Sequence, residues 1–245
     1  LCIEIKNESF RYYPERNLNK LKETIGRFHN IDPSCIMPGN GASEIITWVG
    51  YEAAKYKVNC LPAPGFVDYA RALNCWKAKY FFEKLPKNNF KKTKQPFPIK
   101  PKSDVLWITN PHNPTGQLWN RKSLEELIDN YKLVICDEAF ISLTPNGENE
   151  SLIPLTKKFD NLIVIRSLTK LFSIPGLRLG YMISSPRICQ NLNALRDPWP
   201  VNSLAIQAGI RLLNSKEEYK EWIMKIHTWI DIEKQRLTNE LKKIS

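Results

Sequence analysis

The stretch Arg166-Ser167-Leu168-Thr169-Lys170, which continues as LFSIPGLRLGY to Tyr181, decides how this chain of 245 residues is interpreted. It places one lysine close to two hydroxyl side chains and, after a short interval, to an arginine. A lysine that forms a Schiff base with an aldehyde cofactor needs such neighbours, because hydroxyl groups and a guanidinium can hold a phosphate beside it. For a single lysine, a solvated loop position is the ordinary alternative. The combination of Ser167, Thr169, Lys170 and Arg178 favours the Schiff-base interpretation.

On both sides of this stretch, short apolar runs rich in β-branched and aromatic residues alternate with helical patterns. This alternation predicts an α/β fold, in which helical crossovers join the strands. The predicted strands lie near residues 59–62, 78–82, 104–109, 131–137, 162–166 and 179–184. The predicted helices cover residues 18–28, 42–55, 66–75, 122–130, 186–196, 202–213 and 216–243.

Composition and charge limit the functional classes. A hydrophobic content of 42% is ordinary for a globular core, and the formal net charge of +11 attracts anionic partners. The dense lysine cluster at Lys84–Lys102 shows no repeated interleaving of aromatic residues, so nucleic acid is not the expected partner. Phosphorylated small molecules are the expected partners, and a merely solvated surface is the alternative. No apolar run is long enough to span a bilayer, which predicts no membrane partner.

Cysteine and histidine usage argues against a metal site. The six cysteines form no Cys-x-x-Cys pair, and the three histidines show no metal-ligand spacing. We expect reduced, mostly buried thiols and a cytoplasmic location. The cysteines are Cys2, Cys35, Cys60, Cys75, Cys136 and Cys189.

The segment Gly39-Asn40-Gly41-Ala42-Ser43-Glu44 is a glycine turn that opens a predicted helix. The free backbone N–H groups of a helix start and the Ser43 hydroxyl can bind an anion. Glu44 replaces the third glycine of a dinucleotide fingerprint and no good strand precedes the turn, so that motif is excluded. A simple helix cap is the alternative.

Three further segments fit around a pyridine ring that bears a phosphate. Asn113, in the loop Asn110–Gly116 after an apolar strand, can donate a hydrogen bond to a ring oxygen, although Asn-Pro turns are common. Asp137 ends another apolar strand; if buried it needs a cation, which a protonated pyridine nitrogen would supply, whereas a cap or loop role is the alternative. Phe66, in Pro64-Gly65-Phe66, can stack on the ring or belong to the core.

In order and approximate spacing, these segments resemble the fold-type I (class I and II) aminotransferase family over essentially the whole chain. The resemblance implies a large domain that binds pyridoxal 5'-phosphate (PLP), with a mostly parallel sheet flanked by helices. Lys170 would carry PLP as a Schiff base, Asp137 would pair with the ring nitrogen, Asn113 would contact the ring oxygen, and Phe66 would stack. The implied phosphate-binding residues are Ala42, Ser43, Ser167, Thr169 and Arg178.

The resemblance also concerns assembly and domain organisation. Tyr13 matches a tyrosine that reaches the phosphate in the neighbouring subunit, which implies a homodimer with shared sites. Asn202 is implied to lie near the substrate. The implied parts are an N-terminal and dimer-contact segment over residues 1–38, the PLP-binding domain over 39–215, and a connecting helix over 216–245.

Relatives continue for roughly another hundred residues into a small C-terminal domain, a size within the usual domain range. We expect this chain to be a cofactor domain without that substrate lid. It would then be part of a complete enzyme, a truncated form, or a non-catalytic PLP-binding fragment or dimerising scaffold.

Within the family, RSLTKLFSIPGLRLGY, PGFVDYARAL, CDEAFI and DPWPVNSLA most resemble L-threonine O-3-phosphate decarboxylases of cobalamin biosynthesis. Histidinol-phosphate aminotransferases are the close second, and another class I/II aminotransferase is a further alternative. Phe140 favours the decarboxylases, because transaminases of this group usually have tyrosine there. The implied product is (R)-1-amino-2-propanol O-2-phosphate. The two reactions differ in which bond to the α-carbon lies perpendicular to the ring, and sequence does not display that angle.

Overall fold

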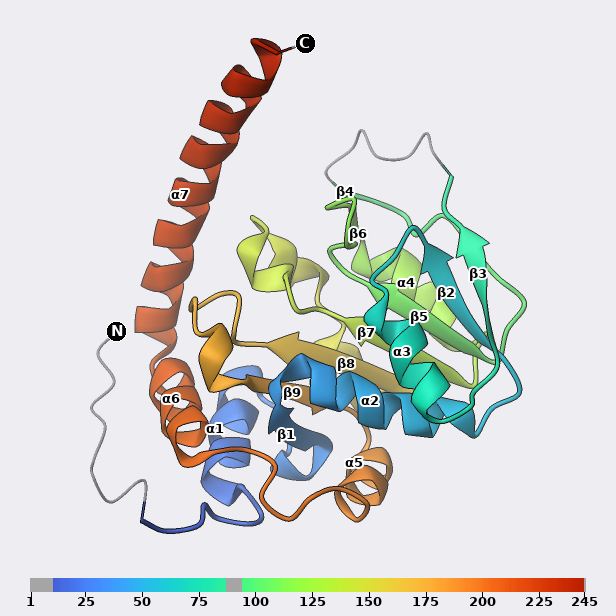
Figure 1. The fold of residues 1–245 in the computed structure, drawn as a ribbon, viewed down its shortest axis with the longest axis vertical. Coiled ribbons are helices and arrows are strands. Elements are labelled where there is room, and N and C mark those ends of the chain that lie inside the picture. The colour runs from blue at the N-terminus through green and yellow to red at the C-terminus, as the bar shows by residue number, and fades with distance from the viewer. Residues whose placement is uncertain (1–10, 87–93, 245) are drawn as a thin grey trace.

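The computed structural model describes residues 11–86 and 94–244, and these residues form a twisted sheet with helices on both faces (Figure 1). The sheet has seven strands in the order β1-β9-β8-β7-β5-β2-β3. The strands from β8 to β3 in this order are parallel, whereas β9 runs antiparallel to both β1 and β8. The strands are β1 (Ile36–Asn40), β2 (Asn59–Ala63), β3 (Tyr80–Lys84), β5 (Val105–Thr109), β7 (Leu133–Asp137), β8 (Leu162–Ser167) and β9 (Leu179–Ile183).

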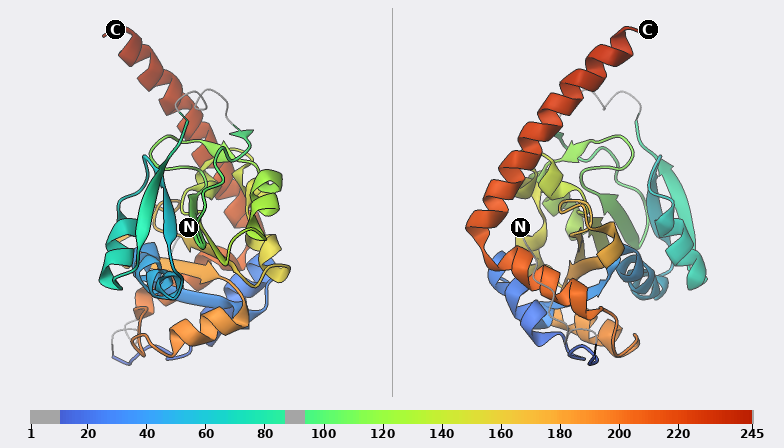
Figure 2. Two further views of the ribbon diagram at one scale, coloured as in Figure 1. Left: turned by 90° about the vertical axis from the view of Figure 1, so that its right-hand side faces the viewer. Right: turned by 60° about the vertical axis from the view of Figure 1, so that its left-hand side comes forward.

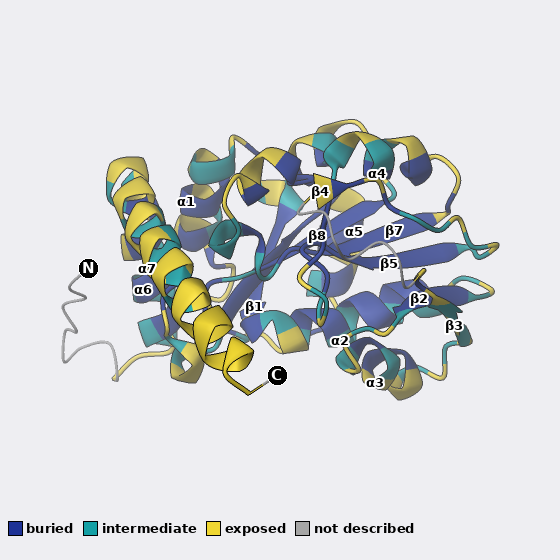
Figure 3. Cartoon of the chain, turned by 90° about the horizontal axis from the view of Figure 1, so that it is seen from above, coloured by how far each residue is buried: buried dark blue, intermediate teal, exposed yellow. Residues whose placement is uncertain are grey.

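Successive side chains along each strand point to opposite faces of the sheet, and this divides the hydrophobic core into two layers. One layer contains apolar residues of α2, α3 and α5 against one face of the sheet. The other contains those of α1, α4 and α6 against the opposite face. The helices are α1 (Asn19–His29), α2 (Gly41–Ala54), α3 (Asp68–Cys75), α4 (Arg121–Ile128), α5 (Pro186–Asn193), α6 (Ser203–Asn214) and α7 (Lys216–Lys242). Figure 3 shows the buried sheet between these layers.

The predicted α/β fold with a mostly parallel sheet is confirmed, because each predicted strand and helix has its counterpart among these elements. The sequence did not predict the strand β1 or the short pair β4 (Lys94–Gln95) and β6 (Leu118–Trp119). The expectation that no strand precedes the glycine turn at Gly41 is therefore wrong. Pro38 and Gly39 concealed β1, but β1 lies at the sheet edge, where a proline without an N–H group is tolerated.

The helix α7 projects away from the body of the molecule, as Figures 1 and 2 show. Its first turns pack on the core through Tyr219, Trp222 and Ile223. Further along the helix, Leu237 and Leu241 are 55% and 57% exposed. Within the described chain, α7 therefore packs on the core only near its start.

The described residues also bear on the predictions about cysteines, metals and membranes. Cys60, Cys136 and Cys189 are buried free thiols, Cys75 is an exposed one, and Cys2 lies outside the described residues. Within residues 11–86 and 94–244, no cluster of His, Cys, Asp or Glu is placed to hold a metal ion. Over the same ranges, no helix has the length and apolar character needed to cross a lipid bilayer.

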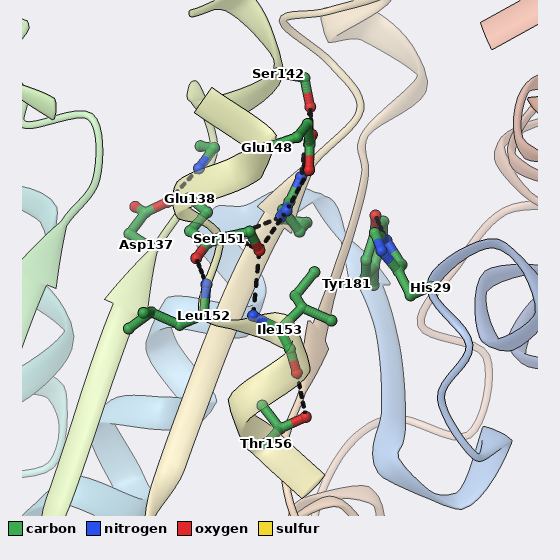
Figure 4. A network of polar contacts seen from close by, with 12 residues as sticks. His29, Asp137, Glu138, Ser142, Glu148, Ser151, Leu152, Ile153, Thr156 and Tyr181 are labelled. Carbon is green, nitrogen blue, oxygen red and sulfur yellow. Dashed lines mark hydrogen bonds and ion pairs between the residues drawn. The ribbon is translucent and has the colours of Figure 1, made fainter. Parts of the chain in front are cut away.

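A histidine at the end of α1 is inserted beside β9. The Nε2 atom of His29 lies 2.7 Å from the hydroxyl of the buried Tyr181, and Figure 4 shows the two side chains together. Burial lowers the pKa of His29 to about 3, and the positive charge of Arg166 acts in the same direction. The folded protein therefore holds His29 in its neutral form.

We expect His29 to make the protein less stable as the pH falls below 6.5. Unfolded His29 takes up a proton near its ordinary pKa of 6.5, whereas the folded protein resists protonation down to about pH 3. The free energy of unfolding should therefore decrease with falling pH, by up to roughly 1.4 kcal/mol per pH unit from this group. His29→Gln should flatten this dependence between pH 6.5 and 4, as measured by urea unfolding. Equal slopes for the two proteins would contradict the assignment.

Candidate active site

One cavity of about 230 Å³ brings together most of the residues that the sequence singled out. It lies at the carboxyl ends of β5, β7 and β8, where open α/β sheets bind their ligands. Helix α2 begins beside the same cavity. Among its lining residues are Ala42, Ser43, Phe66, Asn113, Asp137, Ser167, Thr169, Lys170 and Arg178.

One wall of the cavity is built to receive an anion. The first turn of α2 contributes Ala42 and Ser43, and the N–H groups of a first turn have no partner within the helix. The hydroxyl oxygens of Ser167 and Thr169 lie 2.8 Å apart, and Arg178 lines the same wall. Hydroxyls, backbone N–H groups and a guanidinium together form the donor set that a phosphate requires.

Two glycines allow this wall to form. A Cβ atom on Gly41, whose φ is +78°, would lie 2.5 Å from Nη2 of Arg178. A Cβ atom on Gly180 would lie 2.7 Å from the backbone nitrogen of Ala42 and 2.9 Å from the carbonyl oxygen of Arg166. Gly41 therefore adopts a left-handed conformation and leaves room for the Arg178 guanidinium, whereas Gly180 allows α2 to approach β9 this closely.

Elsewhere in the cavity lining, Asp137 is a buried carboxylate. The hydroxyl of Tyr69 donates a hydrogen bond of 2.8 Å to Oδ2, and the N–H group of Ala139 donates one of 2.9 Å to Oδ1. Burial raises the pKa of Asp137, and the two hydrogen bonds oppose that shift. Among the residues that the structure describes, no ion pair reaches Asp137. A protonated ring nitrogen is the type of group that would complete this site.

The other predicted residues also line the cavity. Lys170 is exposed on the turn after β8, and Asn113 lies on the loop after β5. The ring of Phe66 packs edge-on against Tyr69, with the ring centroids 5.4 Å apart. Phe140 lines the cavity without a hydroxyl group.

Tyr13 and Asn202 are not brought to this cavity in the described chain. Tyr13 is 79% exposed and stacks on Trp199, with the ring centroids 4.5 Å apart. Asn202 caps α6, since its Oδ1 accepts a hydrogen bond of 2.9 Å from the N–H group of Ala205. Its Nδ2 donates a hydrogen bond of 3.1 Å to the carbonyl oxygen of Leu177. The roles expected of Tyr13 toward a partner subunit and of Asn202 toward a substrate stay predictions.

Tyr69 and Thr109 were not among the site residues predicted from the sequence. Both line the cavity, and their hydroxyl oxygens lie 2.9 Å apart. One signal for Tyr69 was present, because residues three apart at a helix start lie on the same side, and Phe66 was already a candidate. His112 lies outside the cavity lining, and its Nδ1 atom is 2.8 Å from the Thr115 hydroxyl oxygen.

Behind the sheet, a buried ion cluster supports the cavity (Figure 4). Arg166 is 4% exposed, and its Nε lies 2.9 Å from Oε2 of Glu138. Its two terminal nitrogens donate to the two carboxylate oxygens of Glu148, at 2.8 and 2.9 Å. Because neighbours in a strand point to opposite faces, Glu138 and Arg166 lie behind the sheet while Asp137 and Ser167 face the cavity.

Comparison with known proteins gives one family. The model of the family described as aminotransferase class I and II matches residues 3–245. A protein of Caldanaerobacter subterraneus subsp. tengcongensis named "Putative threonine-phosphate decarboxylase" is 33% identical, over 98% of this chain and 66% of its own length. Histidinol-phosphate aminotransferase 2 of Haemophilus influenzae is 30% identical, over 84% of this chain and 57% of its own length. The chain thus spans two thirds or less of the length of these two relatives.

Solved structures share the fold. Histidinol-phosphate aminotransferase from Clostridium acetobutylicum matches with a TM-score of 0.80 and 25% identity, over 97% of this chain and 70% of that one. The enzyme of the same name from Sinorhizobium meliloti, solved in complex with pyridoxal-5'-phosphate, matches with a TM-score of 0.75 and 17% identity, over 89% of this chain and 60% of that one. PLP is the cofactor of the family. The anion-binding wall fits its phosphate, and Asp137, which no ion pair reaches among the described residues, fits its ring nitrogen.

We expect Gly180→Ala to weaken PLP binding by about tenfold or more, equal to about 1.4 kcal/mol, because the new Cβ displaces the first turn of α2. Gly176→Ala is the matched control, since nothing lies within 4 Å of a Cβ atom built there. The measurement is a fluorescence titration of the apoprotein with PLP, with circular dichroism to verify folding. Equal PLP affinities in the two variants would show that the close approach at Gly180 does not matter for binding.

Proposed function

Since this chain belongs to the class I and II aminotransferase family, we propose that its protein is a PLP-dependent enzyme that decarboxylates L-threonine O-3-phosphate. The similarity to the Caldanaerobacter protein over nearly the whole chain supports this substrate. The observation that carries the choice of reaction is Phe140 in the cavity wall. The sequence resemblance implies a tyrosine at this place in the transaminases of the group, and its hydroxyl would give the ring oxygen a second hydrogen bond.

Each part of PLP has a matching group in the cavity. Lys170 would hold the cofactor covalently, and the start of α2 with Ser167, Thr169 and Arg178 would hold its phosphate. Asp137 would pair with the ring nitrogen, Phe66 would cover one ring face, and Asn113 would donate to the ring oxygen. When bound, PLP supplies an electron sink for the bond that breaks at the α-carbon of the substrate.

The proposed reaction is balanced without another reactant. The bond between the α-carbon and the carboxylate breaks, carbon dioxide leaves, and a proton takes its place on the α-carbon. Lys170 lines the cavity and is our candidate for delivering that proton. The formal net charge of +11 suits a phosphorylated substrate by attracting it from solution. The partner subunit of a homodimer, with Tyr13 as a contributing residue, belongs to the same proposal.

Histidinol-phosphate aminotransferase is the second candidate. The enzymes of that name from Haemophilus influenzae and Clostridium acetobutylicum support it, since they match this chain about as well. Its substrate also bears a phosphate, so the charge of the surface favours neither candidate. The difference is chemical: transamination removes the hydrogen from the α-carbon and passes the amino group to a 2-oxo acid.

We expect borohydride reduction of the PLP-loaded protein to fix a pyridoxyl group on Lys170. Borohydride reduces a Schiff base to a stable amine, so peptide mapping by mass spectrometry locates the lysine. Lys170→Ala serves as the control and should yield no adduct. An adduct on a different lysine, or none in the parent protein, would remove the basis of the proposed function.

We expect the full-length protein to release carbon dioxide and form aminopropanol phosphate from L-threonine phosphate faster than it transfers the amino group of histidinol phosphate. Both products are measured by mass spectrometry, with 2-oxoglutarate as acceptor in the second assay. Asp137→Asn should lose at least about 100-fold in either rate, or about 2.7 kcal/mol, because a neutral amide does not hold the ring nitrogen protonated. Robust amino transfer without carbon dioxide release would replace the first candidate with the second.

A further inference from the structure

Asp137 depends on a neighbour that the cofactor assignments leave out. Its carboxylate receives two hydrogen bonds in the described chain, from the N–H group of Ala139 and from the hydroxyl of Tyr69. The first comes from the residue two places further along the same segment. The second comes from α3, which packs on the sheet from outside that segment. Tyr69 is therefore the tertiary contact that fixes this carboxylate.

The direction of the hydrogen bonds follows from counting protons. An ionised carboxylate only accepts, so the single hydroxyl hydrogen of Tyr69 lies on the 2.8 Å bond to Oδ2 of Asp137. The hydroxyl oxygen of Thr109 lies 2.9 Å from that of Tyr69 and must donate to it. Thr109, Tyr69 and Asp137 thus form a directed chain, and each bond polarises the next one.

The hydrogen-bond chain of Thr109, Tyr69 and Asp137 is buried. Tyr69 is 4% exposed, and its ring packs beside Trp107, with the ring centroids 5.2 Å apart. Asp137 is 5% exposed, and burial raises its pKa, whereas the hydrogen bonds from Tyr69 and Ala139 lower it. Without the Tyr69 hydroxyl, the neutral acid becomes more favourable in this site. A neutral Asp137 does not stabilise a protonated ring nitrogen.

The other charged and titratable groups near Asp137 are engaged elsewhere, so Tyr69 is the side chain that favours its ionised form. Lys170 and Arg178 line the same cavity from the segment between β8 and β9, on the wall assigned to the phosphate and the Schiff base. Cys136 and Glu138 precede and follow Asp137 in the chain and point to the opposite face of the sheet. Glu138 is neutralised there by Arg166.

We propose that Tyr69 is a positioning residue, which, with Thr109 behind it, holds Asp137 ionised and oriented for the ring nitrogen of PLP. The inference rests on the proposed PLP-dependent function and adds a residue to it. Tyr69 also packs against Phe66. One side chain therefore contacts both Asp137, proposed for the ring nitrogen, and Phe66, proposed for the ring face. Tyr69→Phe removes the hydroxyl and retains these ring contacts.

The test compares Tyr69→Phe with Tyr131→Phe. Tyr131 is a buried tyrosine remote from the cavity lining, and its hydroxyl donates a hydrogen bond of 3.1 Å to the carbonyl oxygen of Pro101. The two variants lose the same group, so a general effect on stability affects both. The apoprotein of each is titrated with PLP between pH 5 and 9, and the carboxyl of Asp137 is followed in the apoprotein by carbon-13 NMR.

We expect Tyr69→Phe to raise the pKa of Asp137. At pH values below the Asp137 pKa of the parent protein, PLP binding should weaken by about tenfold for each unit by which this pKa increases. Affinity should recover as the pH rises, because Asp137 then ionises without help. Thr109→Val, which removes only the donor to Tyr69, should shift both quantities in the same direction by less, and it replaces Tyr69→Phe if that variant does not fold. Tyr131→Phe should match the parent protein.

Two outcomes would overturn the inference. One is an unchanged Asp137 pKa and PLP affinity in Tyr69→Phe and Thr109→Val. The other is an equal loss of PLP affinity from Tyr69→Phe in the Asp137→Asn background, where a positioning effect through Asp137 has nothing left to act on. These readouts use no substrate and do not depend on which reaction is catalysed. Failure of the Lys170 adduct would instead remove the proposed function itself.

Discussion

The pairing of the buried Arg166 with the buried Glu138 and the partly exposed Glu148 is the contact on which the geometry of the site depends. It joins the end of β8 to the residue that follows β7, behind the sheet. The adjacent residues, Asp137 before Glu138 and Ser167 after Arg166, face the cavity. A guanidinium that leaves water loses much solvation, and two carboxylates offset this loss only at close range. Removing one partner of such a pair typically costs about 3–5 kcal/mol. The positions of Asp137 and Ser167 relative to each other are thereby fixed from behind the sheet.

The same cluster connects the cavity to α7. The Ser142 hydroxyl donates to Glu148 at 2.5 Å and accepts a hydrogen bond of 3.1 Å from Tyr219 of α7. Further along α7, the indole N–H group of Trp222 donates to the carbonyl oxygen of Leu171, at 2.8 Å, next to Lys170. The start of α7 therefore contacts the ion cluster of Arg166, through Ser142 and Glu148, and also the turn that bears Lys170. A shift of this helix would be transmitted to both of these parts of the site.

Periodicity and residue chemistry predicted most of this fold and most of the cavity, because strands of β-branched residues and polar residues at their ends are local features. Strand β1 was missed because its Pro38 and Gly39 are acceptable only at an edge, and sequence does not reveal which strand is at the edge. Tyr69 was missed as a partner of Asp137 because that contact requires α3 to pack over β5 and β7. The burial of Arg166 likewise depends on two carboxylates from separate segments.

The groups proposed to bind PLP are separate from those that would bind the substrate, and this explains why the chain matches decarboxylases and aminotransferases about equally well. Its cavity lining contains two basic side chains, Lys170 and Arg178, and the proposed fit to PLP would engage both with the cofactor. In the proposed reaction, the choice of which α-carbon bond breaks would then be set by the groups that bind the substrate's carboxylate and phosphate, since they would orient the α-carbon relative to the ring. Those groups can vary between relatives while the sheet, the buried ion cluster and the PLP-binding walls stay the same.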